Sequence, residues 1–256
     1  MLRARVIPCL QLRHDSLVKT VRFRKPAYIG DPVNTVRIFN ELEVDELAFV
    51  DIRASLEGRG PNFAILREIA DECFMPLSYG GGISDVTTAE RILQTGFEKL
   101  ILNSAALENP RLITELASRF GSRAIIVAID VRRTLFQRLR VAGRSGTEVH
   151  DMTAVHWAQE VARLGAGEIL LTSIDREGTW QGFDVALTSQ VSHAVNVPVI
   201  AHGGAGGIDH IRSVVHEGGA SAVAVGSLVV YQGRQSGVLV NFPDKSRLTR
   251  ALEGTG

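Results

Sequence analysis

The sequence predicts an α/β fold, a single (β/α)8 barrel (TIM barrel) built as an internal half-barrel repeat. Three observations predict it. Short apolar runs typical of buried strands recur eight times, with helical patterns between them. The chain has 256 residues, close to the roughly 250 residues of one such barrel. The second half also repeats motifs of the first. An open doubly wound sheet is the alternative, but eight parallel strands are the number that closes.

The expected strands are rich in Val, Ile and Leu, as parallel strands covered on both faces are. In chain order they span 5–11, 45–52, 76–80, 97–102, 123–130, 167–173, 197–201 and 220–225. Helical patterns span 31–43, 84–95, 109–119, 151–164 and 184–194. Asp31 is a suitable N-cap followed by Pro32 at the first helical position, and Ser84 is the expected cap of the next helix.

Three motif pairs carry the repeat. DELAFVDI at 45–52 matches GEILLTSI at 167–174, PLSYGGGI at 76–83 matches PVIAHGGAG at 198–206, and KLILNSAA at 99–106 matches AVAVGSLV at 222–229. A doubled half-barrel predicts paired functional sites across a pseudo-twofold axis.

The whole chain, 1–256, is expected to form one domain. Segments 12–30 and 131–150 are long loops after the first and fifth strands, on the face where such loops commonly act as lids. A hairpin is expected around Gly143 or Gly146. The C-terminal segment 228–256 is expected to be irregular, with 237–243 extended where the last helix would lie.

Composition excludes several classes of protein. The formal net charge is zero, which argues against a nucleic-acid protein. Two cysteines are too few for a disulfide framework and favour a reducing cytoplasm. The N-terminus lacks the apolar stretch of a signal peptide, and no apolar run is long enough to span a membrane. The seven histidines show no metal-ligand spacing, and no cofactor motif is present.

Four turns after strands look like phosphate cradles. They are Gly80–Gly82, Asn103–Ser104, Gly203–Gly207 and Gly226–Ser227. Glycine lets backbone N–H groups approach an anion, and a following helix adds a favourable field. One such turn is more often only a tight connection, but two pairs related by the repeat indicate an elongated, doubly phosphorylated ligand or the vestige of its site.

Two carboxylates end strands at the same face, Asp130 and Asp51. An acid and a base there could run an isomerisation or a cyclisation. Asp51 could equally pair with a loop cation, and Lys19 could contact substrate or remain solvated. Aligning the first and fifth strands places Gln11 opposite Asp130, so the partner of Asp130 is an amide.

Three other side chains are weaker candidates. Cys9 is expected to be a packing residue, because no base lies near it in sequence. His202 ends a strand and could reach ligand, although a core role is the simpler expectation. Trp180 could cover the ligand from its loop.

Four charged residues begin strands at the opposite face: Arg5, Glu46, Lys99 and Glu168. They could be solvated independently. Because they alternate in sign, they could instead form a ring of ion pairs across the barrel floor.

Together these motifs resemble the cyclase subunit family of imidazole glycerol phosphate synthase, from histidine biosynthesis. The resemblance runs from the first strand to about residue 230. It is carried by RVIPCL at 5–10, GDPV at 30–33, VDELAFVDI at 44–52, GGGI at 80–83, NSAALENP at 103–110, VAID at 127–130, GAGEILLTSIDREGT at 165–179 and GGAG at 203–206.

The resemblance implies a (β/α)8 barrel with two phosphate sites and a glutaminase subunit docked on its N-terminal face. Ammonia would then cross the barrel, and Arg5, Glu46, Lys99 and Glu168 would gate its entry. Asp130 and Gln11 fall on the catalytic positions. The ligand-binding positions are Lys19, Asp51, Gly81, Gly82, Asn103, Ser104, Thr172, Glu177, Gly178, Gly203, Gly204, Gly226 and Ser227.

Three departures from the family pattern stand out. Gln11 replaces the first catalytic aspartate, and an amide cannot exchange a proton near neutral pH. Glu177 in DREGT is one methylene longer than the usual aspartate. The tail after Gly226 also differs from the usual last helix. These departures resemble a paralogous branch that works with a glutaminase and a sugar amidotransferase on surface polysaccharide.

Two functions remain open. In the first, the barrel delivers ammonia for amidination of a bacterial surface sugar, with cyclisation reduced or lost. In the second, the chain is a working lyase-type cyclase that forms imidazole glycerol phosphate and the aminoimidazole carboxamide ribonucleotide. A plain isomerase without ammonia is disfavoured by the four charges. In each case the expected ligand is small and phosphorylated.

Overall fold

Eight parallel strands form the centre of the protein, and the computed structural model describes residues 4–234 and 237–253. The barrel strands are β1 (Arg5–Arg13), β4 (Leu47–Asp51), β5 (Leu77–Gly80), β6 (Lys99–Leu102), β7 (Ile125–Arg133), β10 (Glu168–Ser173), β11 (Val199–His202) and β12 (Ala222–Val225). β1 pairs with β12, and β10 pairs with β7, so the sheet closes on itself. The predicted (β/α)8 barrel is therefore confirmed, and the open sheet is excluded.

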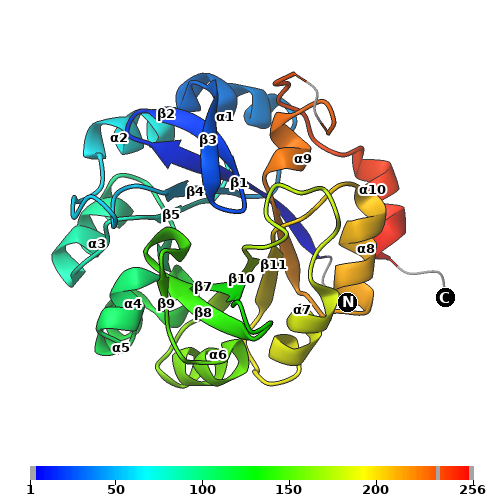
Figure 1. Ribbon diagram of the computed structural model, residues 1–256. Helices are drawn as coiled ribbons and strands as arrows, with labels where there is room; N and C mark the ends of the chain where they lie inside the picture. The colour runs from blue at the N-terminus through cyan, green and yellow to red at the C-terminus, as the bar shows by residue number, and fades with distance from the viewer. Residues whose placement is uncertain (1–3, 235–236, 254–256) are drawn as a thin grey trace.

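Helices surround the barrel, as Figure 1 shows. They are α1 (Pro32–Glu41), α2 (Phe63–Glu72), α3 (Val86–Gln94), α4 (Ser104–Glu108), α5 (Arg111–Phe120), α6 (Ala154–Arg163), α7 (Val185–Ser192), α8 (Ile208–His216), α9 (Ser227–Val230) and α10 (Lys245–Leu252), with short 3-10 turns at Ser122–Ala124 and Arg144–Gly146. Asp31 caps α1 as expected, accepting from the Asn34 N–H at 2.8 Å. The expected cap at Ser84 is wrong, because Asp85 accepts from the Thr88 N–H instead.

Antiparallel hairpins replace the two long loops. β2 (Ser16–Val21) and β3 (Arg24–Gly30) follow β1, while β8 (Leu139–Gly143) and β9 (Glu148–Val149) follow β7. The expected hairpin around Gly143 and Gly146 is present as the β8–β9 pair. Each half of the chain thus begins with a long barrel strand that continues into a hairpin. Both hairpins lie over the same end of the barrel (Figure 1).

The tail is more regular than the sequence indicates. Residues 237–243 form no strand, and only an isolated bridge joins Tyr231 to Val238. They lead into α10, which packs against α8. Leu248 is the buried residue of α10, so the last helix was missed because a single apolar anchor gives a weak pattern.

The barrel interior forms its own small core. Alternate residues of each strand face inward, because side chains alternate across a strand. Ile7, Cys9, Ala48, Ile101, Ile126, Ala128, Leu170, Ile200, Ala222 and Ala224 make up this cluster, which is separate from the core between strands and helices. The same alternation, continued to both ends of the strands, brings charged residues to the floor and polar residues to the mouth.

Candidate functional site at the barrel mouth

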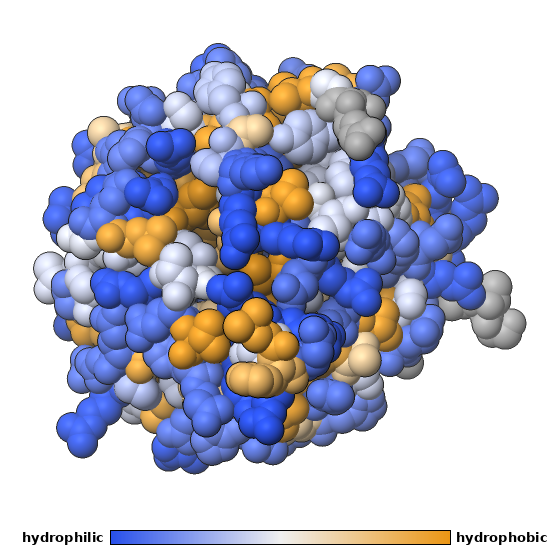
Figure 2. All heavy atoms as spheres, in the orientation of Figure 1, coloured by the Kyte–Doolittle hydropathy of each residue, from blue (hydrophilic) through white to orange (hydrophobic). Residues whose placement is uncertain are grey.

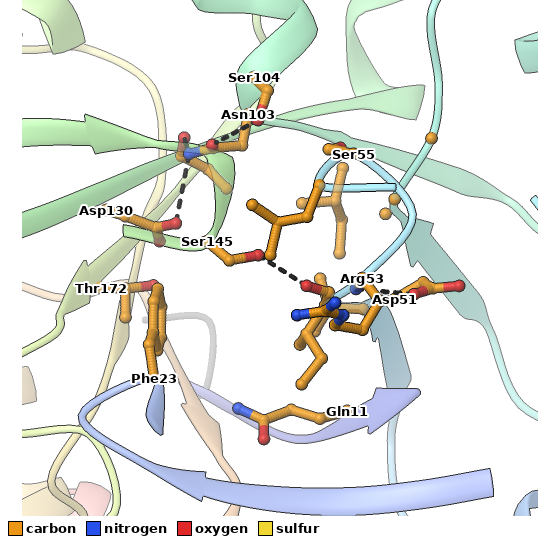
Figure 3. Close-up of a pocket in the computed structure, with 18 of the residues that line it drawn as sticks. Gln11, Phe23, Asp51, Arg53, Ser55, Asn103, Ser104, Asp130, Ser145 and Thr172 are labelled. Carbon is orange, nitrogen blue, oxygen red and sulfur yellow. Dashed lines mark hydrogen bonds between the residues drawn. The ribbon is translucent and has the colours of Figure 1, made fainter. Parts of the chain in front are cut away.

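A cavity of about 270 Å³ lies at the C-terminal ends of the strands. Gln11 and Asp130 line it from β1 and β7, and Figure 3 shows them on opposite sides of the space. Asn103, Ser104 and Thr172 contribute further polar groups. The register explains the arrangement, because Gln11 and Asp130 are the last inward-facing positions of the first strand in each half.

Asp130 is the group best suited to proton transfer. Asn103 donates to its carboxylate at 3.3 Å. Burial raises the pKa of Asp130 to about 7, the hydrogen bond from Thr172 opposes this rise, and the Glu177 carboxylate adds to it. A carboxyl group that titrates near neutral pH can act as a general acid or a general base.

The raised pKa of Asp130 predicts a pH dependence of stability. The folded chain holds a proton that the unfolded chain releases, so the free energy of unfolding should fall as the pH rises from about 4 to about 7. Three pKa units correspond to about 4 kcal/mol, and we expect about 2 kcal/mol because water reaches Asp130 through the cavity. Urea denaturation at about pH 4 and pH 8 should show this loss in the unaltered chain and a smaller one in Asp130→Asn. Equal losses in both would contradict it.

Gln11 is buried, and both its amide oxygen and its amide nitrogen have hydrogen-bond partners. Its amide oxygen accepts from the Thr20 N–H at 2.9 Å and from the Thr20 hydroxyl at 3.1 Å. Its amide nitrogen donates to Glu177 at 3.3 Å. The side chain lines the cavity. Its hydrogen bonds hold it in place, and they link the β2–β3 hairpin to Glu177.

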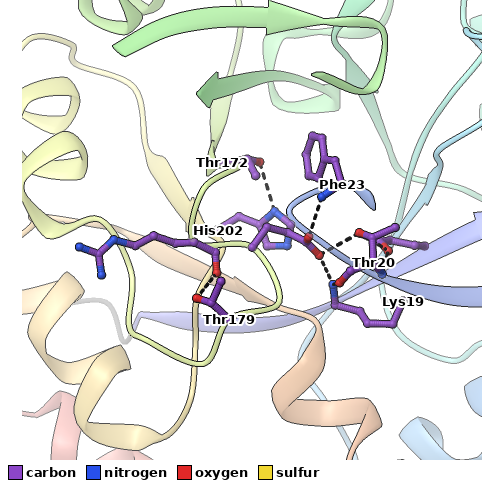
Figure 4. A network of polar contacts seen from close by, with 9 residues as sticks. Lys19, Thr20, Phe23, Thr172, Thr179 and His202 are labelled. Atoms are coloured by element: carbon purple, nitrogen blue, oxygen red, sulfur yellow. Dashed lines mark hydrogen bonds and ion pairs between the residues drawn. The ribbon is translucent and has the colours of Figure 1, made fainter. Parts of the chain in front are cut away.

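Glu177 is the centre of a buried network, with only 1% of its surface exposed. Figure 4 labels its partners Lys19, Thr20 and Phe23. Its carboxylate forms an ion pair with Lys19 and accepts from the Phe23 N–H at 3.0 Å. It also lies 3.1 Å from the Thr20 hydroxyl, whose single proton it shares with the Gln11 amide oxygen. Its carbonyl accepts from the Arg22 N–H at 2.9 Å. Glu177 therefore holds the β2–β3 hairpin against the loop after β10. Sequence reasoning singled out Glu177 but missed Thr20 and Phe23, which carry no motif.

The first pair of cradles borders the main cavity. Gly81 and Gly82 have positive φ, and a β-carbon on Gly82 would lie 2.5 Å from the Arg59 carbonyl. Ser104 accepts from the Arg144 N–H at 3.0 Å, so the loop after β8 is tied to this cradle. Asp51 pairs with Arg59 at 2.8 Å and accepts from two backbone N–H groups of its own loop. Of the two roles that the sequence allowed for Asp51, the structure therefore shows the ion pair with a loop cation, Arg59.

The second pair of cradles borders two other spaces. Gly203, Gly204, Gly226 and Ser227 line about 10 Å³ together with Lys19 and Glu177. Ser227 and Gly178 also line an open cavity of about 600 Å³ beside the hairpin, together with Arg22, Lys25 and Arg234. Gly178 lies beneath the hairpin, where a β-carbon would be 2.6 Å from the Thr20 carbonyl. The structure brings each pair of cradles together but does not join the two pairs in one open cavity.

Three weaker candidates are also placed. Burial raises the pKa of the Cys9 thiol to about 12, which makes it a packing residue rather than a nucleophile. Burial lowers the pKa of His202 to about 4, and its Nδ1 lies 3.2 Å from the Thr172 hydroxyl. Trp180 lines a neighbouring open cavity of about 600 Å³ beside the hairpin rather than the main one.

The floor of the barrel is closed by the four charges. Arg5 contacts Glu46 at 2.6 Å and Glu168 at 2.5 Å, and Lys99 contacts the same two carboxylates at 3.0 and 2.7 Å. The residues therefore form the alternating ring. Between the ring and Asp130 lie the apolar interior residues, among them Ala48, Ala128, Leu170 and Ile200.

In the described part of the chain, no helix is long and apolar enough to cross a bilayer. Across the same residues, no group of three or more His, Cys, Asp and Glu side chains is arranged around a metal-sized space.

A closed parallel barrel with a polar cavity at the C-terminal ends of its strands is the architecture of (β/α)8-barrel enzymes. Within that class, the chain belongs to the histidine biosynthesis protein family, whose model matches residues 5–236.

Relatives match over nearly the whole chain. A Leptospira borgpetersenii protein, provisionally named imidazole glycerol phosphate synthase subunit HisF, is 46% identical over 95% of this chain and 96% of its own length. A Pseudomonas aeruginosa protein provisionally named subunit hisF2 is 46% identical over 97% and 99%. The Alkaliphilus metalliredigens subunit HisF is 44% identical over 90% and 92%. The chain is thus a HisF-like synthase subunit at the level of family.

Proposed function

We propose that this chain is the synthase-type subunit of a glutamine amidotransferase, and that it conducts ammonia for amidination of a bacterial surface sugar. One observation carries the proposal, the contrast between the two ends of the barrel. At the floor, Arg5, Glu46, Lys99 and Glu168 form a complete ring. At the mouth, Gln11 cannot exchange protons and is held by Thr20 and Glu177.

The partners follow from this arrangement. A glutaminase subunit would dock on the N-terminal face around the ring and release ammonia into the interior. Because the interior residues between ring and mouth are apolar, they favour neutral ammonia over ammonium. A sugar amidotransferase would receive the ammonia at the mouth.

A second candidate function is the cyclase reaction that forms imidazole glycerol phosphate. Asp130 favours it, because its pKa of about 7 and its place in the cavity suit proton transfer. This function requires another group to replace the carboxylate missing at residue 11.

Ammonia-dependent turnover separates the two functions. We expect the purified chain, given ammonium chloride and the ribulosyl histidine precursor, to turn over about 10²–10⁴-fold more slowly than a relative with aspartate at both positions, which is the usual effect of losing a general acid or base. We also expect it not to rescue a histidine auxotroph. Rapid turnover at neutral pH that Asp130→Asn abolishes would establish the cyclase instead.

A further inference from the structure

Positive charge is concentrated at the mouth of the barrel. Segments 12–30 and 131–150, which form the hairpins over the mouth, each carry five Lys and Arg residues but only one Asp or Glu. They hold ten of the chain's 28 cations and two of its 28 carboxylates, although the whole chain has a formal net charge of zero. Among the residues that the structure describes, three of the ten cations form ion pairs, Lys19, Arg140 and Arg144. The other seven are Arg13, Arg22, Arg24, Lys25, Arg132, Arg133 and Arg138. The mouth therefore presents positive charge that an acidic partner could neutralise.

The same two segments also expose apolar side chains. They contribute five of the nine large apolar side chains that are exposed in the described part of the chain, namely Val21, Tyr28, Leu135, Phe136 and Val149. Leu135 and Phe136, at the tip of the β7–β8 hairpin, are 96% and 85% exposed. Figure 2, which looks onto this end of the barrel, shows apolar side chains among strongly hydrophilic ones around a central hollow. Exposed aromatic and aliphatic residues beside arginines are typical of protein–protein interfaces.

Asp175, in the loop after β10, fixes the two hairpins relative to each other. Its carbonyl accepts from the Arg22 guanidinium at 3.1 Å, and its carboxylate accepts from the Arg133 N–H at 2.7 Å. The hairpins also touch directly, because a β-carbon on Gly146 would lie 3.2 Å from the Phe23 ring. A surface that is ordered before binding loses little conformational entropy when a partner docks, so this arrangement suits a permanent docking surface.

The two hairpins surround the point at which ammonia would leave the barrel. Thr20 and Phe23 line the main cavity from one hairpin, and Ser145 and Thr147 line it from the segment after β8. Ammonia that met bulk water there would be protonated at neutral pH, as the lysine amine is, and would cease to be a nucleophile. The protein that consumes the ammonia must therefore cover the mouth. A protein can project into the hollow between the hairpins, whereas a flat lipid surface cannot close it (Figure 2).

We propose that the β2–β3 and β7–β8 hairpins form one docking surface for the sugar amidotransferase that consumes the ammonia. The cations meet an acidic face of that partner, and Leu135 and Phe136 enter an apolar pocket in it. The positive charge selects an acidic partner, and the apolar tip favours a protein over a purely charged polymer. The identity of the partner rests on the proposed function.

Binding of the purified sugar amidotransferase from the same organism tests this inference, measured by surface plasmon resonance on the full chain without the glutaminase. The dissociation constant should rise at least about tenfold between about 50 and 300 mM NaCl, because salt screens charges at the edge of an interface. Phe136→Ser removes the aromatic anchor, and the double variant Arg24→Glu, Lys25→Glu reverses two exposed charges. Each should weaken binding at least about tenfold, which is about 1.4 kcal/mol.

Two matched controls lie away from the mouth. Phe74 is 87% exposed, nearly as much as Phe136, but it precedes β5 at the opposite end of the barrel. Arg212 is an exposed cation on α8. Phe74→Ser and Arg212→Glu should both bind the amidotransferase as the unaltered chain does.

Three results would each overturn the inference: no binding of the amidotransferase, unweakened binding by Phe136→Ser and the charge-reversed variant, or equal losses in the two controls. Sedimentation with phosphatidylglycerol vesicles in place of amidotransferase binding would assign the surface to a membrane instead. Product formation from glutamine tests the proposed function separately. Failed binding with intact ammonia delivery contradicts the docking surface alone, whereas intact binding with failed delivery contradicts the conduit.

Discussion

Replacing Glu46 with alanine should lower the free energy of unfolding by about 3 kcal/mol, because it leaves two cations without their partner at the floor of the barrel. Glu46 is 4% exposed and contacts both Arg5 and Lys99. We expect the lower end of the usual 3–5 kcal/mol range, since Arg5 is about one third exposed and water screens part of its charge.

The matched control is Glu98→Ala. Glu98 is exposed and directly precedes Lys99 in the chain. Substitutions of this kind usually change stability by less than about 0.5 kcal/mol. Urea unfolding of both variants measures the difference. Similar small losses in both would show that the ring is not a coupled unit.

If the proposed function holds, the ring of Arg5, Glu46, Lys99 and Glu168 should also affect how efficiently ammonia reaches the product. Lys99→Ala removes one of the two cations that hold Glu46 and Glu168. We expect it to lower product formation from glutamine while leaving the hydrolysis of glutamine by the partner intact, because ammonia would escape at the floor. Unchanged coupling between hydrolysis and product formation would favour the isomerase alternative, in which no ammonia passes through the barrel.

Strand alternation made the barrel and its two ends predictable. Once β1 and β10 are recognised, the period of two places Arg5 and Glu168 inside at the floor, and Gln11 and Thr172 inside at the mouth. This assignment of residues to the floor and the mouth needs only the positions of the strands in the sequence. It explains why the charges that begin strands in the sequence meet as ion pairs in the structure.

Contacts between loops were not predictable, because nothing in a single sequence specifies which loops meet. In the sequence, the segment of the β2–β3 hairpin resembles a cationic loop. Five residues of β3 are exposed, so its apolar and polar residues do not alternate as those of a half-buried strand do. The pairing of Asp51 with Arg59 and of Lys19 with Glu177 depends on how those loops fold back. The burial of Lys19 against Glu177 beside the second pair of cradles follows from these contacts, and the glycine motifs therefore did not predict it.

Restoring an aspartate at residue 11 should have little effect alone and a large effect when Glu177 is shortened as well. Gln11→Asp removes the amide nitrogen that now donates to Glu177 at 3.3 Å. It also places a second carboxylate, on a side chain one methylene shorter, opposite Glu177 in a buried site. Like charges so close raise the pKa of one member of the pair, so the new aspartate would remain protonated at neutral pH.

The double variant Gln11→Asp, Glu177→Asp removes that conflict by withdrawing the second carboxylate, and it also frees Lys19 to meet an anion. Ammonia-dependent turnover of the ribulosyl histidine precursor should rise about 10²-fold over Gln11→Asp alone, the lower range for regaining a general acid or base. Adding Asp130→Asn should abolish the gain. A double variant no faster than the single one would mean that the cavity of about 270 Å³ no longer fits that precursor, whatever acids line it.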